Sequence, residues 1–297
     1  MANRVARNFS FINQFAGTGQ NAMVQRITEL TKSEKGTKAV ITLLADMTGD
    51  GITGDNTLEG NEEALRAYDL TIELDQLRFA NRVAGRLADQ KSVVNFRETS
   101  RDALAYAIAD RMDQLAFLTL SGVAYTLKTS GALRTTSSSA GHELADLEFA
   151  SDVSAPTTNR HRRWDATNGL SAGDVTALVA ADTMQYKCIV ELKAYAKDNY
   201  IRGLRGAGGE EVFHMFVTPQ QMAKLKLDSD FLSNVRSAGI RGPKNELFAG
   251  SSSVLVDGVV IHEYRHVFNT ANATTGTSSN AGAAGYKWGA DADVNGA

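Results

Sequence analysis

Two apolar-rich runs separated by an acidic loop stand out in the first third of the chain. The runs KAVITLLADM (residues 38–47) and YDLTIELDQL (residues 68–77) are rich in β-branched and apolar residues, and Leu70 and Ile72 alternate with polar neighbours. Such runs are typical of half-buried strands, so we predict a long hairpin. The loop between them, residues 48–63, contains four glycines and five acidic residues. A two-stranded hairpin is marginally stable in water, which indicates that another copy of the chain covers it.

The strongest helical pattern covers residues 97–120, which contain no glycine or proline. Its apolar residues recur at helical spacing, and we expect four of them to form a buried face: Leu104, Ile108, Leu115 and Leu118. At about 1.5 Å per residue this helix would be about 36 Å long. Weaker helical patterns cover residues 21–32 and 79–92.

The second half of the chain mixes helical and strand patterns. A helix is predicted from an N-cap at Ser171 onward, a buried strand at residues 212–217, and a further helix with Thr218 as its N-cap. The dipeptide Asp257-Gly258 between β-branched runs is a strong hairpin signal. This order of elements predicts a second domain of α+β or α/β class.

Two other segments lack sustained periodicity. Residues 128–168 are polar and small, and we expect them to run over the surface. Their basic cluster, residues 160–163, is either a solvated loop or a contact for an acidic patch or packaged nucleic acid. The N-terminal segment carries three isolated aromatic residues that would dock into a partner or into a distant part of the fold: Phe9, Phe11 and Phe15.

Composition narrows the class of protein. The length of 297 residues allows about two domains. The formal net charge of −3 gives no basic field for binding nucleic acid in bulk. Cys188 is the only cysteine, which excludes an intrachain disulfide and fits folding in a reducing cytosol. The sequence contains neither a signal-peptide pattern nor 18 consecutive apolar residues, so we expect a cytosolic chain without a membrane span.

Residues 262–266 spell H-E-x-x-H, the signature of zinc peptidases. On a helix this spacing places two imidazoles on one face for zinc, with the glutamate as general base. The preceding hairpin signal predicts instead that a strand continues to Phe268, which would place His262 and His266 about 13 Å apart at about 3.3 Å per residue. One zinc ion cannot bridge that gap. A zinc peptidase using His262, Glu263 and His266 is therefore only an alternative.

The remaining chemical signals are weaker. Four acidic residues of the loop match calcium ligands in type but not in spacing: Asp46, Asp50, Asp55 and Glu59. A calcium-dependent surface-binding module is the second alternative, and it would need an export signal. We find no catalytic constellation and predict neither a cofactor nor a bound metal ion, so the chain is not expected to be an enzyme.

Four stretches support a resemblance to a known family. They are GDGITGDNTLEGNEEAL, LDQLRFANRVAGRLADQKS, VFHMFVTPQQMAKLKLDSDF and LFAGSSSVLVDGVVIHEYRHVF. Together they resemble the major capsid proteins of tailed bacteriophages, which have the Hong Kong 97-type fold, and the podophage branch in particular. The resemblance covers roughly residues 39–268, and its loop motif is the most specific part. Members of the family usually continue with another apolar segment beyond the point where this chain ends.

The resemblance implies an α+β fold with five regions. These are an N-terminal arm (residues 1–35), an extended loop laid over an adjacent subunit (36–95), a peripheral domain with a long spine helix and the polar excursion (96–169), an axial domain (170–253), and a return to the periphery with a tail (254–297).

The function implied is that of a structural protein. Copies would self-assemble as pentamers and hexamers into an icosahedral shell, made in the host cytoplasm, that encloses double-stranded DNA without reading its sequence. A portal protein is an implied partner, with a scaffold and a cement protein as further candidates. Contacts between subunits are expected from Phe9, Phe11 and Phe15 of the arm and from the loop tip, which comprises Asp50, Gly51, Asp55, Leu58, Glu59 and Glu62.

Overall fold

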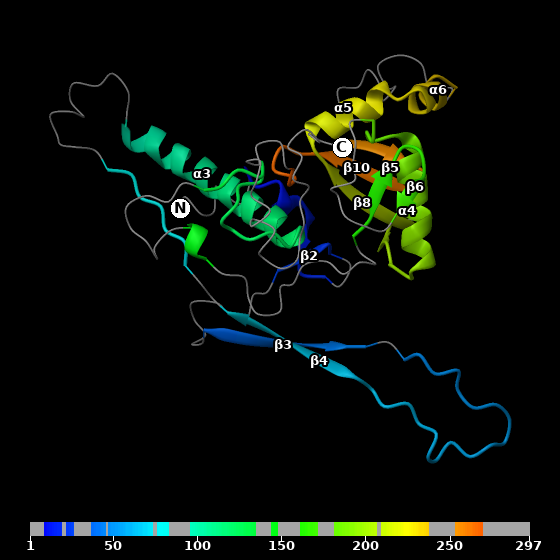
Figure 1. Cartoon of the computed structure of the whole chain (residues 1–297). Helices are drawn as coiled ribbons and strands as arrows, with labels where there is room; N and C mark the ends of the chain where they lie inside the picture. Colours follow the sequence, from blue (N-terminus) through cyan, green and yellow to red (C-terminus); the bar gives the residue numbers. More distant parts are fainter. Residues whose placement is uncertain are drawn as a thin grey trace. The chain divides into compact units, whose positions relative to one another are not determined.

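The computed structural model describes residues 9–19, 22–26, 37–45, 47–73, 76–82, 96–134, 144–147, 161–171, 181–206, 209–237 and 253–269. The chain divides into two units (Figure 1). The hairpin unit comprises residues 26–78 and 150–152, and the main unit comprises residues 1–25, 79–149 and 153–297. Each unit is described by itself.

The hairpin unit consists of two antiparallel strands and the acidic loop. Strand β3 (Lys38–Leu44) pairs with β4 (Ala67–Glu73), which confirms the predicted hairpin. At the base of the loop, the Glu63 carboxylate accepts hydrogen bonds from the backbone N–H groups of Thr48 (2.8 Å) and Gly49 (2.7 Å). These bonds lower the pKa of Glu63. The loop is therefore closed at its base by a carboxylate.

Helix α3 (Phe96–Leu120) in the main unit confirms the long helix within one residue. Of the four residues expected on its buried face, Leu118 is fully buried, whereas Leu104, Ile108 and Leu115 are half-buried. The deepest stripe recurs every four residues and contains Ala105, Ala109, Asp113 and Phe117. Small side chains let other segments approach the helix closely, so burial follows the alanines more than the leucines.

The segment after α3 folds back on the end of the helix. Gly122, at a φ of 65°, lets the chain turn, and the Val123 N–H donates to the Leu118 carbonyl (3.0 Å). Val123 and Leu127 then bury against Leu118. A bridge between Leu127 and Leu133 closes this turn.

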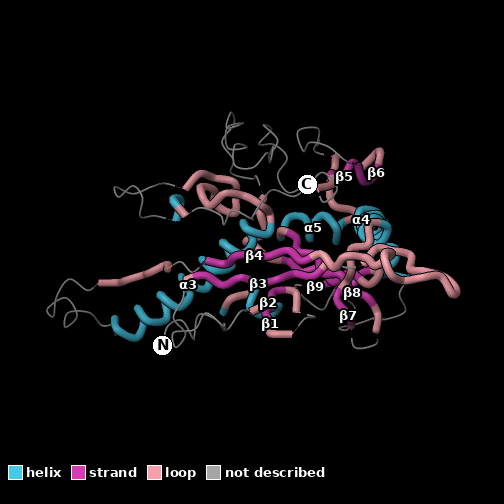
Figure 2. Tube along the Cα trace, turned by 90° about the horizontal axis from the view of Figure 1, so that it is seen from below, coloured by secondary structure: helices cyan, strands magenta, loops and turns pink. Residues whose placement is uncertain are grey.

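A four-stranded sheet and three helices form the largest core. The strand order is β7 (Leu204–Arg205), β8 (Glu211–Val217), β10 (Val259–Glu263) and β9 (Ser253–Val256), and only β8 and β10 run parallel. Helices α4 (Tyr186–Asp198), α5 (Pro219–Leu227) and α6 (Ser229–Ser237) contribute Ile189, Met222, Leu225 and Phe231 to this core (Figures 1 and 2). Fully buried Ile261 lies in the central strand β10.

The predicted Asp257-Gly258 hairpin is confirmed between β9 and β10. Both turn residues have positive φ (46° and 76°), as a two-residue turn between strands with a right-handed twist requires. Strand β10 also pairs with β8 along its whole length. Residues 253–263 therefore belong to the same sheet as residues 211–217, on both sides of the boundary expected between residues 253 and 254, which stays a prediction.

Three local expectations are wrong, two of them because strand pairing overrides the local pattern. Residues 24–25 of the predicted 21–32 helix form strand β2 (Val24–Gln25), parallel to β1 (Ala16–Gly17), which follows the 3-10 helix η1 (Ile12–Phe15). Residues 79–82 are not helical, and the rest of that predicted helix lies outside the described residues. Ser171 is not an N-cap, because it ends strand β6 (Gly169–Ser171).

The described part of the polar excursion contains regular elements. A second 3-10 helix, η2, spans Leu144–Asp146, and β5 (Arg163–Asp165) pairs with β6 around the buried ring of Trp164.

Within the described part of the chain, no helix is long and apolar enough to cross a bilayer.

Helix α5 begins as predicted, with Thr218 as N-cap and Pro219 in the first turn. The Thr218 hydroxyl accepts from the Gln221 N–H (3.3 Å), and the Gln221 side chain accepts from the Thr218 N–H (3.0 Å). Replacing Thr218 by alanine should lower the free energy of unfolding by about 1 kcal/mol, because the half-buried N–H of Gln221 loses its acceptor. Urea unfolding measures this change. Thr218→Ser is the control and should retain most of the stability, and equal losses in both variants would contradict the capping role.

Candidate functional site

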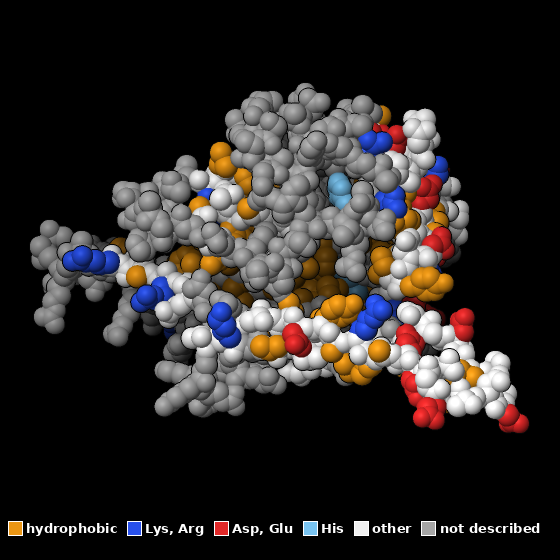
Figure 3. All heavy atoms as spheres, turned by 60° about the horizontal axis from the view of Figure 1, so that its bottom comes forward, with side chains coloured by type: hydrophobic (Ala, Val, Ile, Leu, Met, Phe, Trp, Pro, Cys, Tyr) orange, Lys and Arg blue, Asp and Glu red, His pale blue; other side chains and the backbone are white. Residues whose placement is uncertain are grey.

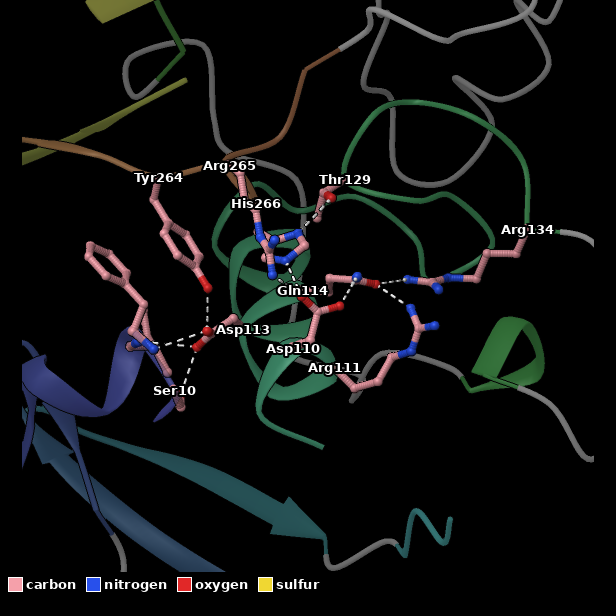
Figure 4. Close-up of polar contacts among 12 residues, drawn as sticks. Ser10, Asp110, Arg111, Asp113, Gln114, Thr129, Arg134, Tyr264, Arg265 and His266 are labelled. Carbon is pink, nitrogen blue, oxygen red and sulfur yellow. Dashed lines mark hydrogen bonds and ion pairs between the residues drawn. The ribbon is translucent and has the colours of Figure 1, made fainter. Parts of the chain in front are cut away.

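A buried carboxylate on α3 joins three distant parts of the main unit (Figure 4). Asp113 is 1% exposed. Its Oδ1 accepts hydrogen bonds from the Ser10 hydroxyl (2.6 Å) and the Ile12 N–H (3.1 Å). Its Oδ2 accepts from the Phe11 N–H (3.0 Å) and from the hydroxyl of Tyr264, just beyond β10. Four donors satisfy a charge that would otherwise be costly to bury.

Tyr264 is held in its protonated form at this junction. Burial raises its pKa well above the usual range, and the hydrogen bond to Asp113 and the negative charge of that carboxylate raise it further. The hydroxyl therefore acts as a permanent donor to Asp113, which suits a structural fastening more than proton transfer.

Aromatic rings cover the same junction. The Phe11 ring stacks on Tyr264 at a centroid distance of 4.2 Å, and Phe15 meets Phe216 edge-on at 5.2 Å. Phe9 lies against Tyr106 of α3 at 4.4 Å. All three phenylalanines of the N-terminal segment thus dock on a distant part of their own chain, which is one of the two outcomes expected. Their role between subunits stays a prediction.

The H-E-x-x-H residues lie on a strand and a turn rather than on a helix. The strand ends at Glu263, so its expected continuation to Phe268 is wrong, because the Tyr264 N–H still bonds to Val217 but the next residues turn towards α3. His262 Nε2 lies 2.9 Å from His214 Nδ1, whereas His266 Nε2 lies 2.6 Å from Asp110 Oδ1. The two histidines therefore have separate partners, which is not the zinc-peptidase arrangement. Among the described residues, no group of three or more His, Cys, Asp or Glu side chains is placed to hold a metal.

Asp110 organises a second polar network on α3. Its carboxylate contacts His266 and the Arg265 guanidinium (2.8 Å), and it accepts from Gln114 Nε2 (2.9 Å). Burial by itself would raise the pKa of Asp110, but the hydrogen bond and charge of His266, with Arg265 and Arg111, lower it overall. Asp110 therefore remains ionised over the physiological pH range.

Other predicted site residues have different positions. The loop-tip residues of the hairpin unit are all exposed: Asp50, Gly51, Asp55, Leu58, Glu59 and Glu62. Asp46 and Arg160 lie outside the described residues. The Arg162 guanidinium lies over the Tyr195 ring at 4.2 Å, so this member of the basic cluster has a packing role. Burial raises the pKa of the Cys188 thiol to about 12, which leaves it unreactive.

Sequence reasoning missed Asp113, Tyr264 and His214 as partners of the N-terminal segment. One signal was available for Asp113, because a charged residue follows Ala105 and Ala109 at the same helical spacing. A carboxylate on a buried stripe needs donors from elsewhere. No local pattern identifies the donors, since Ser10 and Tyr264 are 103 and 151 residues away.

Comparisons with known proteins agree with one another. A family model described as phage capsid protein matches residues 1–292. The major capsid protein of Pseudomonas phage KPP25 is 56% identical over 298 residues, which cover 99% of this chain and 74% of that protein.

Two solved structures share the fold. The capsid of Ralstonia phage GP4 matches with a TM-score of 0.64 and 22% identity, over 87% of this chain and 70% of that one. The capsid asymmetric unit of cyanophage Pam1 matches with a TM-score of 0.64 and 18% identity, over 97% of this chain and 75% of that one.

Truncating Asp113 should loosen the N-terminal segment. Asp113→Ala would leave the Ser10 hydroxyl, two backbone N–H groups and the Tyr264 hydroxyl without their acceptor, so we expect the free energy of unfolding to fall by about 2–4 kcal/mol. Limited proteolysis should then cleave the chain first near residues 9–19. Asp102→Asn, an exposed position of the same helix, is the control and should behave as the parent does. An unchanged cleavage pattern in Asp113→Ala would contradict the fastening role.

The His214–His262 pair should make the subunit less stable in acid. Burial lowers the pKa of both groups from the ordinary 6.5, and for His262 the proximity of His214 lowers it further. Below pH 6.5 the unfolded chain therefore binds more protons than the folded chain, so stability is retained above this pH and is lost as the pH falls below it. The melting temperature of the unassembled subunit should drop between about pH 7 and pH 5. The double variant His214→Gln, His262→Gln should reduce the drop, whereas the control His161→Gln should not.

Proposed function

The chain belongs to the phage capsid protein family, and we propose that its copies join into a shell through the β3–β4 hairpin. It is a major capsid protein, and its function is structural. The observation that carries the proposal about the hairpin is an apolar sheet face on which Leu43 and Tyr68 are exposed.

The register of the hairpin separates two faces. Because side chains alternate along each strand, the pairs Ile41–Leu70 and Leu43–Tyr68 place their side chains on one face, with Ile72 beside them. We define these five residues as the apolar face. On the opposite face the Thr42 hydroxyl donates to the Asp69 carboxylate (2.7 Å). Figure 3 shows apolar side chains along the strands and acidic side chains around the loop.

The apolar face favours association. Leu43 and Tyr68 are 54% and 60% exposed. Fully burying one such side chain stabilises a complex by about 1.5–3 kcal/mol. A hairpin of two strands gains little stability alone, so a surface of a second copy is the natural cover. In a shell the same contact repeats at every subunit, and small gains per copy add up over the assembly.

We assign the remaining regions from the family resemblance. The hairpin unit corresponds to the extended loop of the Hong Kong 97-type fold, α3 to its spine helix, and the sheet with α4, α5 and α6 to its axial domain. Pentamers and hexamers of this chain, a portal protein, and a scaffold or cement protein are the partners proposed on the same basis. Assembly in the host cytoplasm follows from the same resemblance.

Two neighbouring leucines test the role of the hairpin. Leu43 belongs to the apolar face, whereas Leu44, which is 65% exposed, pairs with Ala67 on the opposite face. Leu43→Lys should prevent closed particles because it places a charge in the proposed interface, and Leu44→Lys should assemble as the parent does. Electron microscopy of the purified variants shows whether closed particles form, and the melting temperature of the subunits checks that each variant is folded. Normal particles from folded Leu43→Lys would refute the proposed contact.

A further inference from the structure

Two guanidinium groups converge beside α3, with no carboxylate of the described residues between them. Arg111 Nη1 donates to Gln114 Oε1 at 2.6 Å, and Arg134 Nη2 donates to the same oxygen at 3.5 Å (Figure 4). The shared acceptor is a neutral carboxamide, which orients both groups and neutralises neither. Among the ion pairs of the described residues, none includes Arg111 or Arg134.

The position of this arginine pair, Arg111 and Arg134, is fixed by its surroundings. Arg134 Nε donates to the Tyr125 carbonyl (2.7 Å), and the Arg134 N–H donates to the Thr126 carbonyl (2.8 Å). Gln114 is held in turn by its bond to Asp110. Both side chains are half-buried. A ligand would therefore meet guanidinium groups that are already in place.

The charges of the network do not balance. The Asp110 carboxylate contacts Arg265 and His266, and of the arginine pair only Arg111 is close enough to affect its pKa. Asp113 already accepts hydrogen bonds from neutral donors of residues 10–12 and Tyr264. Burial, and then the neighbouring charge of Arg111, lower the pKa of Arg134. Paired cations of this kind are stabilised by an added anion.

We propose that the arginine pair binds a carboxylate of the acidic loop of a second copy, residues 49–63. The partner rests on the proposed function, in which the hairpin contacts another subunit. The loop has five acidic residues and no lysine or arginine. Asp50, Asp55 and Glu59 are exposed and form no ion pair among the described residues. Guanidinium and carboxylate groups match in charge and in planar geometry.

A phosphate of packaged DNA is the competing anion. The formal net charge of −3 gives the chain no basic field that would hold DNA against it. The acidic loop is present once in every copy, as is the arginine pair. Each subunit can therefore offer the loop to one neighbour and the arginine pair to another, which is the head-to-tail arrangement that closes rings.

A double-mutant cycle with neutral variants tests the proposal. One variant is R111Q/R134Q, the second is D50N/D55N/E59N, and the third combines both sets. Each of the first two should raise the subunit concentration at which shells form by at least about tenfold, as loss of a charged interface contact does. The combined variant should need no more protein than either set alone, because both sets remove the same contact. Light scattering and electron microscopy determine the threshold.

Controls separate this contact from folding and from the hairpin interface. Arg101→Gln removes one positive charge from the same helix and should leave the threshold unchanged. Melting temperatures check that every variant is folded, since Arg134→Gln also loses the hydrogen bond to the Tyr125 carbonyl. Additive losses in the combined variant would overturn the proposal, as would arginine variants that assemble normally, whether or not they package less DNA. If Leu43→Lys blocks assembly while R111Q/R134Q does not, the result supports the hairpin interface and contradicts the arginine contact.

Discussion

The buried charge of Asp113 is the constraint on which the main unit depends. A carboxylate that is 1% exposed is tolerated only when donors surround it. Ser10, the backbone of residues 11 and 12, and Tyr264 supply those donors, so the N-terminal segment and the chain after β10 must both reach α3. The stacking of Phe11 on Tyr264 then follows from the same placement. The Asp113 carboxylate thus holds residues 10–12, helix α3 and Tyr264 together.

The two units differ in how far their own residues cover their charged and apolar groups. The main unit satisfies its buried carboxylate and its apolar core internally, around Asp113 and Ile261. The hairpin unit has an apolar face with Leu43 and Tyr68 exposed, and an exposed acidic loop. This division suits the assembly proposed above, because a contact with a second copy would stabilise the hairpin unit, which has little core of its own.

Sequence reasoning succeeded where structure is local and failed where it is shared between distant segments. The β3–β4 hairpin, α3, the Thr218 cap and the Asp257-Gly258 turn all follow from short-range patterns. The strand at Val24–Gln25 and the end of β10 at Glu263 depend on partners elsewhere in the chain, so periodicity predicted them wrongly. For the same reason the arginine pair was not foreseen, since Arg111 and Arg134 meet only because the chain turns back after Gly122.

The Glu63 carboxylate at the base of the acidic loop has a consequence for the kinetics of shell growth. By joining backbone N–H groups 14 and 15 residues away, it ties the ends of the loop before any neighbour arrives. A loop with tied ends has fewer conformations to give up on contact than a free segment of equal length. In the contact proposed above, a neighbouring subunit would meet a loop restricted in shape, so a larger fraction of collisions would lead to capture.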